Sequence, residues 1–346
     1  GIYLTLDFVT LHPLAKGEVA EFPNETLSVH EFKTMIHFSP SAMKIWETFA
    51  LNLMNHVNPY TKVAWKEEPA IAFVSLVNED AILGAAALTP RIRRWIERRF
   101  EEYCRKHNLT VRYENRENLW NRFMTEQLNR GYQHMERVLR SAGCRFPITS
   151  HNNNDSCTMS AMRTRFDYAD THSYFQAPTA YMTPYRAPMY VDTRSSVGSL
   201  FSGENHFSAR LAGKPFVCTE WDFVNPSPHA AEGGILMSAY AALNGWSGLC
   251  HFQLIGDAER DLDCDNRTIN LFTAINNPLM HLSLRAGPLL FLRKDVKEAK
   301  ESVLFCLPSD FMKNIPMPER KPEMIDQVGM ICKAGTLVFD PSKPVE

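Results

Sequence analysis

The sequence comprises 346 residues with a formal net charge of −2, so it is long enough for one large core or two ordinary ones. The near-neutral charge excludes a general electrostatic attraction to nucleic acid or anionic lipid, and a neutral ligand fits better. No apolar run approaches the ~20 residues of a membrane span, and the first residues lack the basic and then apolar order of a signal peptide.

The first predicted element is a core strand over residues 3–9, with Asp7 and His12 near its end. The chain begins abruptly within this strand, so we expect a further segment before Gly1. The mixed polar segment 14–37 is predicted to be a loop.

Three long helices are predicted next, over residues 39–56, 90–104 and 118–142. A Ser-Pro pair starts the first helix, a Thr-Pro pair starts the second, and a glycine ends the third. The arginines of the second helix alternate with glutamates, which favours a solvated face over a polyanion site. Apolar side chains recur at helical spacing in the first helix at Ile45, Phe49 and Leu53.

Two short apolar strands end in a glutamate. The run 71–77 leads into Asn78 and Glu79, and the run 215–219 leads into Glu220. Two carboxylates at strand ends, surrounded by aromatic side chains, indicate acid/base and nucleophilic chemistry on a glycosidic bond.

Strands and helices alternate along most of the chain. Polar residues at strand ends favour a parallel α/β fold, and specifically a (β/α)8 TIM barrel, although only about six of its eight strands are found. A long loop over residues 176–210 is predicted to form an active-site wall. The remaining predicted elements are strands at 146–150, 167–172, 248–253 and 302–307, and helices at 230–243 and 279–287.

The predicted organisation is a barrel over residues 1–295 and a small β-rich region over residues 296–346. The eight cysteines show neither CxxC pairs nor ligand spacing, so we predict buried free thiols and no zinc site. We predict no metal and no cofactor.

Three motifs resemble those of one group of enzymes. Asn78-Glu79 after an apolar strand resembles the fourth-strand Asn-Glu of the clan A retaining glycoside hydrolases, and Glu220 between Thr219 and Trp221 resembles their seventh-strand nucleophile. The segment 170–174 is similar to the His-x-Tyr of their sixth strand. The order and separation of the motifs agree over roughly residues 1–295, but they assign no family within the clan.

The resemblance implies a role for each matching residue. Glu79 is implied as the acid/base and Glu220 as the nucleophile. Asn78 would bind the sugar 2-hydroxyl, Tyr174 would donate a hydrogen bond to the nucleophile, and His172 would orient a carboxylate or touch substrate.

The resemblance also explains the short strand count, because residues 1–7 match the third strand of the clan. The first two strands, which often carry an arginine near the nucleophile, would then be missing. The eighth strand of the clan usually ends in a tryptophan under the sugar, and here Phe252 or Trp246 would replace it. Further candidates for sugar contacts, each equally open to a packing role, are Asp7, His12, His151, Asn152, Trp221, Trp246, His251 and Phe252.

The expected function is a retaining β-glycosidase acting on an oligo- or polysaccharide. A catalytically silent carbohydrate-binding relative is the alternative, and a secreted or periplasmic location is compatible with both. A metal-dependent barrel hydrolase is disfavoured because no strand carries a His-x-His pair. The separation of the two carboxyls distinguishes mechanisms, because ~5 Å supports retention and ~6.5 to 9.5 Å suggests inversion.

Overall fold

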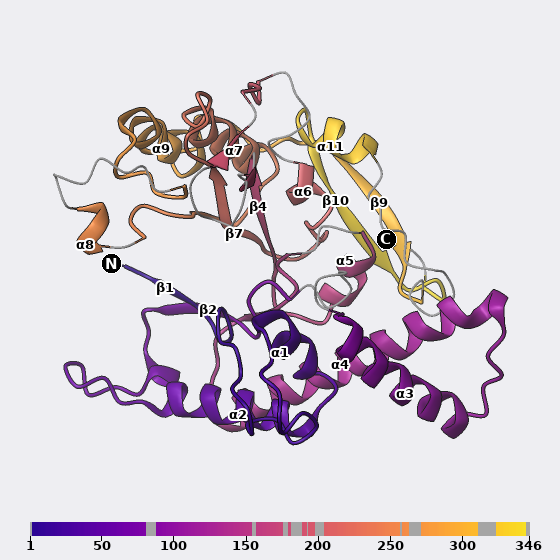
Figure 1. The fold of residues 1–346 in the computed structure, drawn as a ribbon. Helices are drawn as coiled ribbons and strands as arrows, with labels where there is room; N and C mark the ends of the chain where they lie inside the picture. The colour runs from indigo at the N-terminus through magenta and orange to yellow at the C-terminus, as the bar shows by residue number, and fades with distance from the viewer. Residues whose placement is uncertain are drawn as a thin grey trace.

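The computed structural model gives an α/β fold with parallel strands, in which helices and strands alternate along the chain (Figure 1). The residues that it describes are 2–80, 88–153, 157–175, 179–180, 189–191, 193–197, 204–256, 258–262, 271–310 and 323–343.

Three strands of the N-terminal half form one parallel sheet in the order β1 (Leu4–Asp7), β2 (Ile71–Ser75), β3 (Ile148–Thr149). The sheet extends past β2, because the Leu76 amide donates to the Thr149 carbonyl at 2.9 Å. All of its strands therefore point their carboxyl ends, and the polar residues that follow, to the same edge.

Three later strands form a second parallel sheet in the order β4 (Ala169–Phe175), β7 (Phe216–Phe223), β8 (Gly248–His251). The six strands of the two sheets match the six strands predicted from the sequence, with ends that differ by a few residues.

Hydrogen bonds near the ends of β3 and β4 link the two sheets. The Asp167 amide donates to the Ile148 carbonyl at 3.0 Å, and the His172 amide donates to the Asn152 carbonyl at 2.6 Å. The strands thus follow one another in chain order as an arc, and the described strands do not close into a barrel.

The three predicted long helices are confirmed as α2 (Pro40–Asn55), α3 (Pro90–Lys106) and α4 (Arg116–Ser141). The Ser39 hydroxyl caps α2 by accepting the Ala42 amide at 3.0 Å. The buried face of α2 consists of Ala42, Trp46, Ala50 and Met54. The apolar residues noted in the sequence, Ile45, Phe49 and Leu53, form a neighbouring stripe on α2, and Phe49 is 48% exposed.

The predicted loop at 14–37 is wrong in part, because it contains α1 (Val29–Met35). Ser28 and Glu31 form a capping box, with hydrogen bonds of 2.9 and 3.3 Å between their side chains and each other's amides. This Ser-x-x-Glu spacing is a sequence signal for the N-terminus of a helix.

Two helices cover the second sheet, α7 (Glu232–Leu243) and α9 (Pro278–Phe291), and they lie side by side in Figure 1. A methyl group at Gly234 would lie 2.5 Å from Ser283, so glycine permits this close approach. The shorter elements are η1 (Trp65–Glu67), η2 (Tyr113–Asn115), α5 (Cys157–Arg163), β5 (Thr179–Ala180), β6 (Met189–Tyr190), α6 (Glu204–Phe207) and α8 (Ala258–Asp261).

The C-terminal region consists of β9 (Ser302–Pro308), α11 (Glu323–Gly329) and β10 (Lys333–Phe339), and the two strands are parallel. It is joined to the preceding part by the Thr336 amide, which donates to the Arg210 carbonyl at 2.7 Å. The boundary at residue 295 stays a prediction.

None of the helices in the described ranges is both long enough and apolar enough to cross a membrane. The six cysteines whose state the structure gives are free thiols, and three of them, Cys104, Cys144 and Cys218, are buried.

Candidate active site

Glu79 and Glu220 meet at the carboxyl ends of the strands, with His172 between them. One carboxylate oxygen of each glutamate and one ring nitrogen of the histidine all lie within 4.8 Å of one another. His172 Nδ1 is 3.3 Å from Glu79 Oε1 and 3.4 Å from Glu220 Oε2. The sequence-predicted carboxylates are therefore neighbours in space, although they are 141 residues apart in the chain.

Strand register places the histidine and the tyrosine beside Glu220. His172 on β4 is the partner of Glu220 on β7. Tyr174 lies two residues further along β4, on the same face as His172, because side chains alternate along a strand. Its hydroxyl donates a hydrogen bond to Glu220 Oε2.

The turn that carries Asn78 and Glu79 is held by Asn152, which follows β3. Asn152 Oδ1 accepts the Glu79 amide at 2.7 Å, and its Nδ2 lies 3.5 Å from Asn78 Oδ1. Glu79 has a φ of 48°, a left-handed conformation that costs a non-glycine residue energy and is often found at functional sites. Asn152 is thus placed as a positioning residue, and it is fully buried.

A buried polar network supports the same turn from below. His37 Nε2 lies 3.2 Å from Asp80 Oδ2, and the Tyr132 hydroxyl donates to the same carboxylate. His151 Nδ1 lies 3.4 Å from that hydroxyl, and burial lowers the pKa of His151 to about 3. His151 therefore belongs to this network, and the sequence interpretation missed its other members.

The shared histidine affects both glutamates. The hydrogen bond with His172 lowers the pKa of Glu79. Burial raises the pKa of Glu220, although the His172 charge and the Tyr174 hydrogen bond oppose that rise. Burial acts against the charged form of His172, but the bond with Glu79 and the charge of Glu220 outweigh it and raise the pKa of His172.

Aromatic rings surround the Glu220 side of the site. The Tyr174 ring lies 6.2 Å from the Phe252 ring and 5.2 Å from the Phe272 ring. Phe252 was predicted, whereas Phe272 was missed because it comes from a segment without strand or helix periodicity. Asp7, at the end of β1, lies near enough that the His172 charge affects it, and burial raises the pKa of Asp7.

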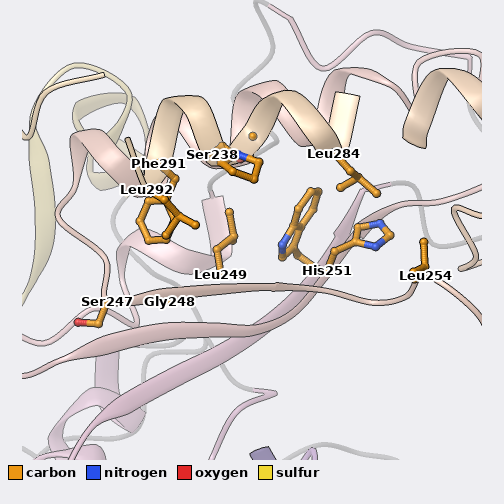
Figure 2. Close-up of a pocket in the computed structure, with 12 residues that line it drawn as sticks. Ser238, Ser247, Gly248, Leu249, His251, Leu254, Leu284, Phe291 and Leu292 are labelled. Carbon is orange, nitrogen blue, oxygen red and sulfur yellow. The ribbon is translucent and has the colours of Figure 1, made fainter. Parts of the chain in front are cut away.

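Four candidates lie apart from the carboxylates. Trp246 is 4% exposed in the core, where its ring lies 5.1 Å from the Phe216 ring. Trp221 is next to Glu220 but faces the opposite side of β7, and it lines a cavity of about 410 Å³ between β8 and α9. His251 points into that cavity (Figure 2) and its Nε2 lies 2.9 Å from Asp222 Oδ1.

His12 is the fourth of these candidates. It is exposed in the loop after β1, at the rim of a cavity of about 340 Å³ that Asp7 and Phe32 also line. Its ring lies 6.3 Å from the Phe32 ring. The structure thus places Trp246 in the core and Trp221 and His251 in the cavity beside α9, and sugar contacts at these residues stay a prediction.

Glu79, His172 and Glu220 could also offer three ligand atoms to a metal ion. Ligands at ~2.1 Å from a tetrahedral ion lie about 3.4 Å apart, and the distances of 3.3 and 3.4 Å from His172 Nδ1 to the two carboxylates match that spacing. The contacts that these three side chains make with one another and with Tyr174 already stabilise their charges without a metal ion.

No protein-family model and no curated protein matches the sequence. Among solved structures, the chain is similar to the β-galactosidase from Rahnella sp. R3, with 16% identity and a TM-score of 0.51, over 87% of this chain and 48% of that one. The endo-β-1,4-mannanase from Thermotoga petrophila has 15% identity and a TM-score of 0.46, over 77% and 54% of the two chains. The β-galactosidase from Halorubrum lacusprofundi has 13% and 0.48, over 88% and 50%.

This chain spans about half the length of each of these structures. The likeness to the Rahnella enzyme concerns the fold, and it confirms at that level the resemblance to clan A glycoside hydrolases that the motifs predicted. The comparisons assign no family to the chain.

Proposed function

We propose that this chain carries the active site of a retaining β-glycoside hydrolase, with Glu79 as the acid/base and Glu220 as the nucleophile. The observation that carries the proposal is the pair of carboxylate oxygens within 4.8 Å of each other. Retaining glycosidases hold their two carboxyl groups ~5 to 5.5 Å apart, whereas inverting enzymes need room for a water molecule between carboxylate and sugar.

The reaction is a double displacement. In the first step a Glu220 oxygen forms a bond to the anomeric carbon while the bond to the leaving oxygen breaks, and Glu79 gives that oxygen its proton. In the second step Glu79 takes a proton from water, whose oxygen displaces Glu220 from the sugar. Both glutamates end in their starting states, so the sum is hydrolysis.

The pKa order of the free site is opposite to the order that these roles need, since the pKa of Glu79 is lowered and that of Glu220 is raised. A bound glycoside would reverse the preference. Its glycosidic oxygen accepts a hydrogen bond only from protonated Glu79 and competes with His172 for that carboxyl. Positive charge developing at the anomeric carbon favours ionised Glu220.

Asn78 and Phe252 would make the sugar contacts. Asn78 is 5% exposed and precedes Glu79. Its side-chain amide would bind the sugar hydroxyl on the carbon next to the anomeric carbon. Phe252 offers a ring face to the C–H surface of a neutral sugar, which matches the small net charge of the chain. The substrate we propose is a neutral oligo- or polysaccharide.

The fold we propose for the complete site is a (β/α)8 barrel, in which two further parallel strands lie between β8 and β1. Within the described residues β1 pairs on one side only, and Ile2, Tyr3 and Leu4 are 85%, 73% and 44% exposed. The cavity between β8 and α9, whose lining Figure 2 shows, adjoins β8, the strand at the other end of the arc. Apolar residues at both ends support the presence of covering elements.

The test uses Glu220→Gly and Glu79→Ala in the full-length protein, assayed on a panel of aryl β-glycosides with and without azide. Each variant should lose at least about 100-fold in turnover, because each removes a group that acts on the reacting bonds. Azide should rescue both. It should give the α-glycosyl azide from Glu220→Gly and the β-glycosyl azide from Glu79→Ala.

The products also test the roles. If Glu220→Gly gave the β-glycosyl azide and Glu79→Ala gave the α-glycosyl azide, the roles of Glu79 and Glu220 would have to be exchanged. Unchanged turnover in both variants would remove the mechanism. Glycan binding by the unaltered protein without any turnover would favour the silent carbohydrate-binding alternative.

A further inference from the structure

Lys33, in the middle of α1, is a buried lysine that neither the motifs nor the comparisons single out. Its side chain is 3% exposed. Within the part of the chain that the structure describes, its ammonium has no hydrogen-bond or ion-pair partner. Lysine is almost never buried without a partner, because removing its charge from water costs free energy.

The anchoring of α1 determines where Lys33 points. Glu31 receives two hydrogen bonds from the Arg91 guanidinium and one from the Thr89 hydroxyl at 2.5 Å, so that side of α1 faces the start of α3. Residues two positions apart in a helix differ by about 200° around its axis. Lys33 therefore lies on the opposite face, on the same side as His30, which precedes it by nearly one turn.

α1 lies beside the strand ends that carry the carboxylates of the site, because Phe32 and Asp7 line one cavity and His37, just after α1, pairs with Asp80. Burial lowers the pKa of Lys33, and the attraction of four carboxylates from three strand ends opposes this effect. In order of their effect, the four are Glu79, Asp80, Asp7 and Glu220. Lys33 and His30 both act in turn to lower the pKa of Glu79. Since Asp80 already pairs with His37, the carboxylates whose charge Lys33 can balance are Glu79, Asp7 and Glu220.

We propose that Lys33 is the cationic member of the active site, where its ammonium binds a hydroxyl group of the glycan and balances the charge of Glu79, Asp7 and Glu220. The ammonium has three N–H donors and none is used by a described residue, so a sugar hydroxyl would satisfy it on binding. This inference rests on the proposed glycosidase function. It adds a specificity and positioning residue to that site.

The experiment compares Lys33→Met, which keeps the length of the side chain without its charge, with Lys33→Arg in the full-length protein. Lys33→Met should lower kcat/KM on the best aryl glycoside by about 10- to 100-fold, the effect of losing a hydrogen bond from a charged donor. Its acidic limb in the pH profile should move up by about one pH unit, since a cation that favours ionised carboxylates is gone. Lys33→Arg should restore most of both.

Lys44→Met is the matched control, because Lys44 on α2 is 72% exposed and pairs with Glu47. It should leave activity and pH profile unchanged. A purely structural role for Lys33 predicts that Lys33→Met lowers Tm while the pH profile stays in place, and that result would overturn the proposal. Besides Lys33, the charges of His172 and His30 also lower the pKa of Glu79, and all of these variants keep both histidines.

A readout without catalysis separates this inference from the glycosidase function. The Glu79 carboxyl can be titrated by NMR after ¹³C labelling of glutamate, with Glu79→Gln to assign its signal. Its pKa should rise in Lys33→Met and not in Lys44→Met. If the protein is inactive but Lys33→Met raises the pKa of Glu79, the glycosidase function is contradicted and Lys33 remains the cation of the site. If the protein is active and the pKa of Glu79 does not rise, only the role of Lys33 is contradicted.

Discussion

His172 lies within hydrogen-bonding distance of both glutamates, so a proton at this site belongs to three side chains rather than to one. Tyr174 breaks this symmetry, because it donates a hydrogen bond to Glu220 and its hydroxyl has no such bond to Glu79. A donor to the charged form of a carboxylate favours ionisation. The single tyrosine hydroxyl thereby acts on Glu220 alone and opposes the rise in the Glu220 pKa that burial causes.

Tyr174→Phe should therefore raise the pKa of Glu220 and shift the acidic limb of kcat/KM to higher pH. Activity at low pH should be lost first, and kcat should fall by about 10- to 100-fold through weaker orientation of Glu220, the proposed nucleophile. The check is a pH profile of the variant beside Tyr113→Phe, since Tyr113 is fully exposed. An unmoved acidic limb would show that the hydroxyl does not act on Glu220.

At the scale of elements, α1 depends on Glu31. This side chain is 3% exposed, and burial acts against its charge, but hydrogen bonds from Arg91 and Thr89 prevail and lower the pKa of Glu31 to about 2 from an ordinary 4.5. The folded pKa is depressed, so this contribution to stability is complete above about pH 4.5 and is lost as the pH falls towards 2.

Glu31→Gln should lower the free energy of unfolding by about 1 to 3 kcal/mol at pH 7, because a buried charged hydrogen-bond partner is lost. The difference from the unaltered protein should shrink as the pH falls below 4.5, and denaturant unfolding at several pH values measures it. Glu25→Gln is the control, since Glu25 binds the same Arg91 from a half-exposed position. An equal loss of unfolding free energy in both variants would mean that the Glu31 hydrogen bonds do not hold α1 in place.

At the scale of the whole molecule, the stripe of α2 that contains Phe49 distinguishes an open arc from a closed barrel. Phe49 is 48% exposed and lines the cavity beside the end of β1. In the proposed barrel a neighbouring unit would cover it, and a charge there would then be buried.

Phe49→Asp should therefore lower the free energy of unfolding of the full-length protein by at least about 2 kcal/mol, measured by denaturant titration. Tyr113→Asp, at a fully exposed position, should change it by less than about 0.5 kcal/mol. A loss at Phe49 no larger than at Tyr113 would contradict the closure of the barrel around this helix.

The strands and the two glutamates could be predicted from the sequence because each depends on a local pattern, an apolar run followed by a polar residue. The network around Asp80 could not, since His37 and Tyr132 reach it from helical regions 43 and 52 residues away. Lys33 was hidden for a different reason, because a seven-residue helix shows too few turns for its apolar periodicity to stand out.

Asn152 has a consequence for how this site could change. Its carbonyl holds the backbone of His172 and its side chain holds the backbone of Glu79, so one uncharged residue joins the two sheets at the point where they meet. That joint holds the Glu79 turn beside His172, the histidine that contacts both carboxylates. Widening the gap between the carboxyls enough to admit a water molecule on the opposite face of the sugar would begin at this asparagine, and neither glutamate would need to be replaced.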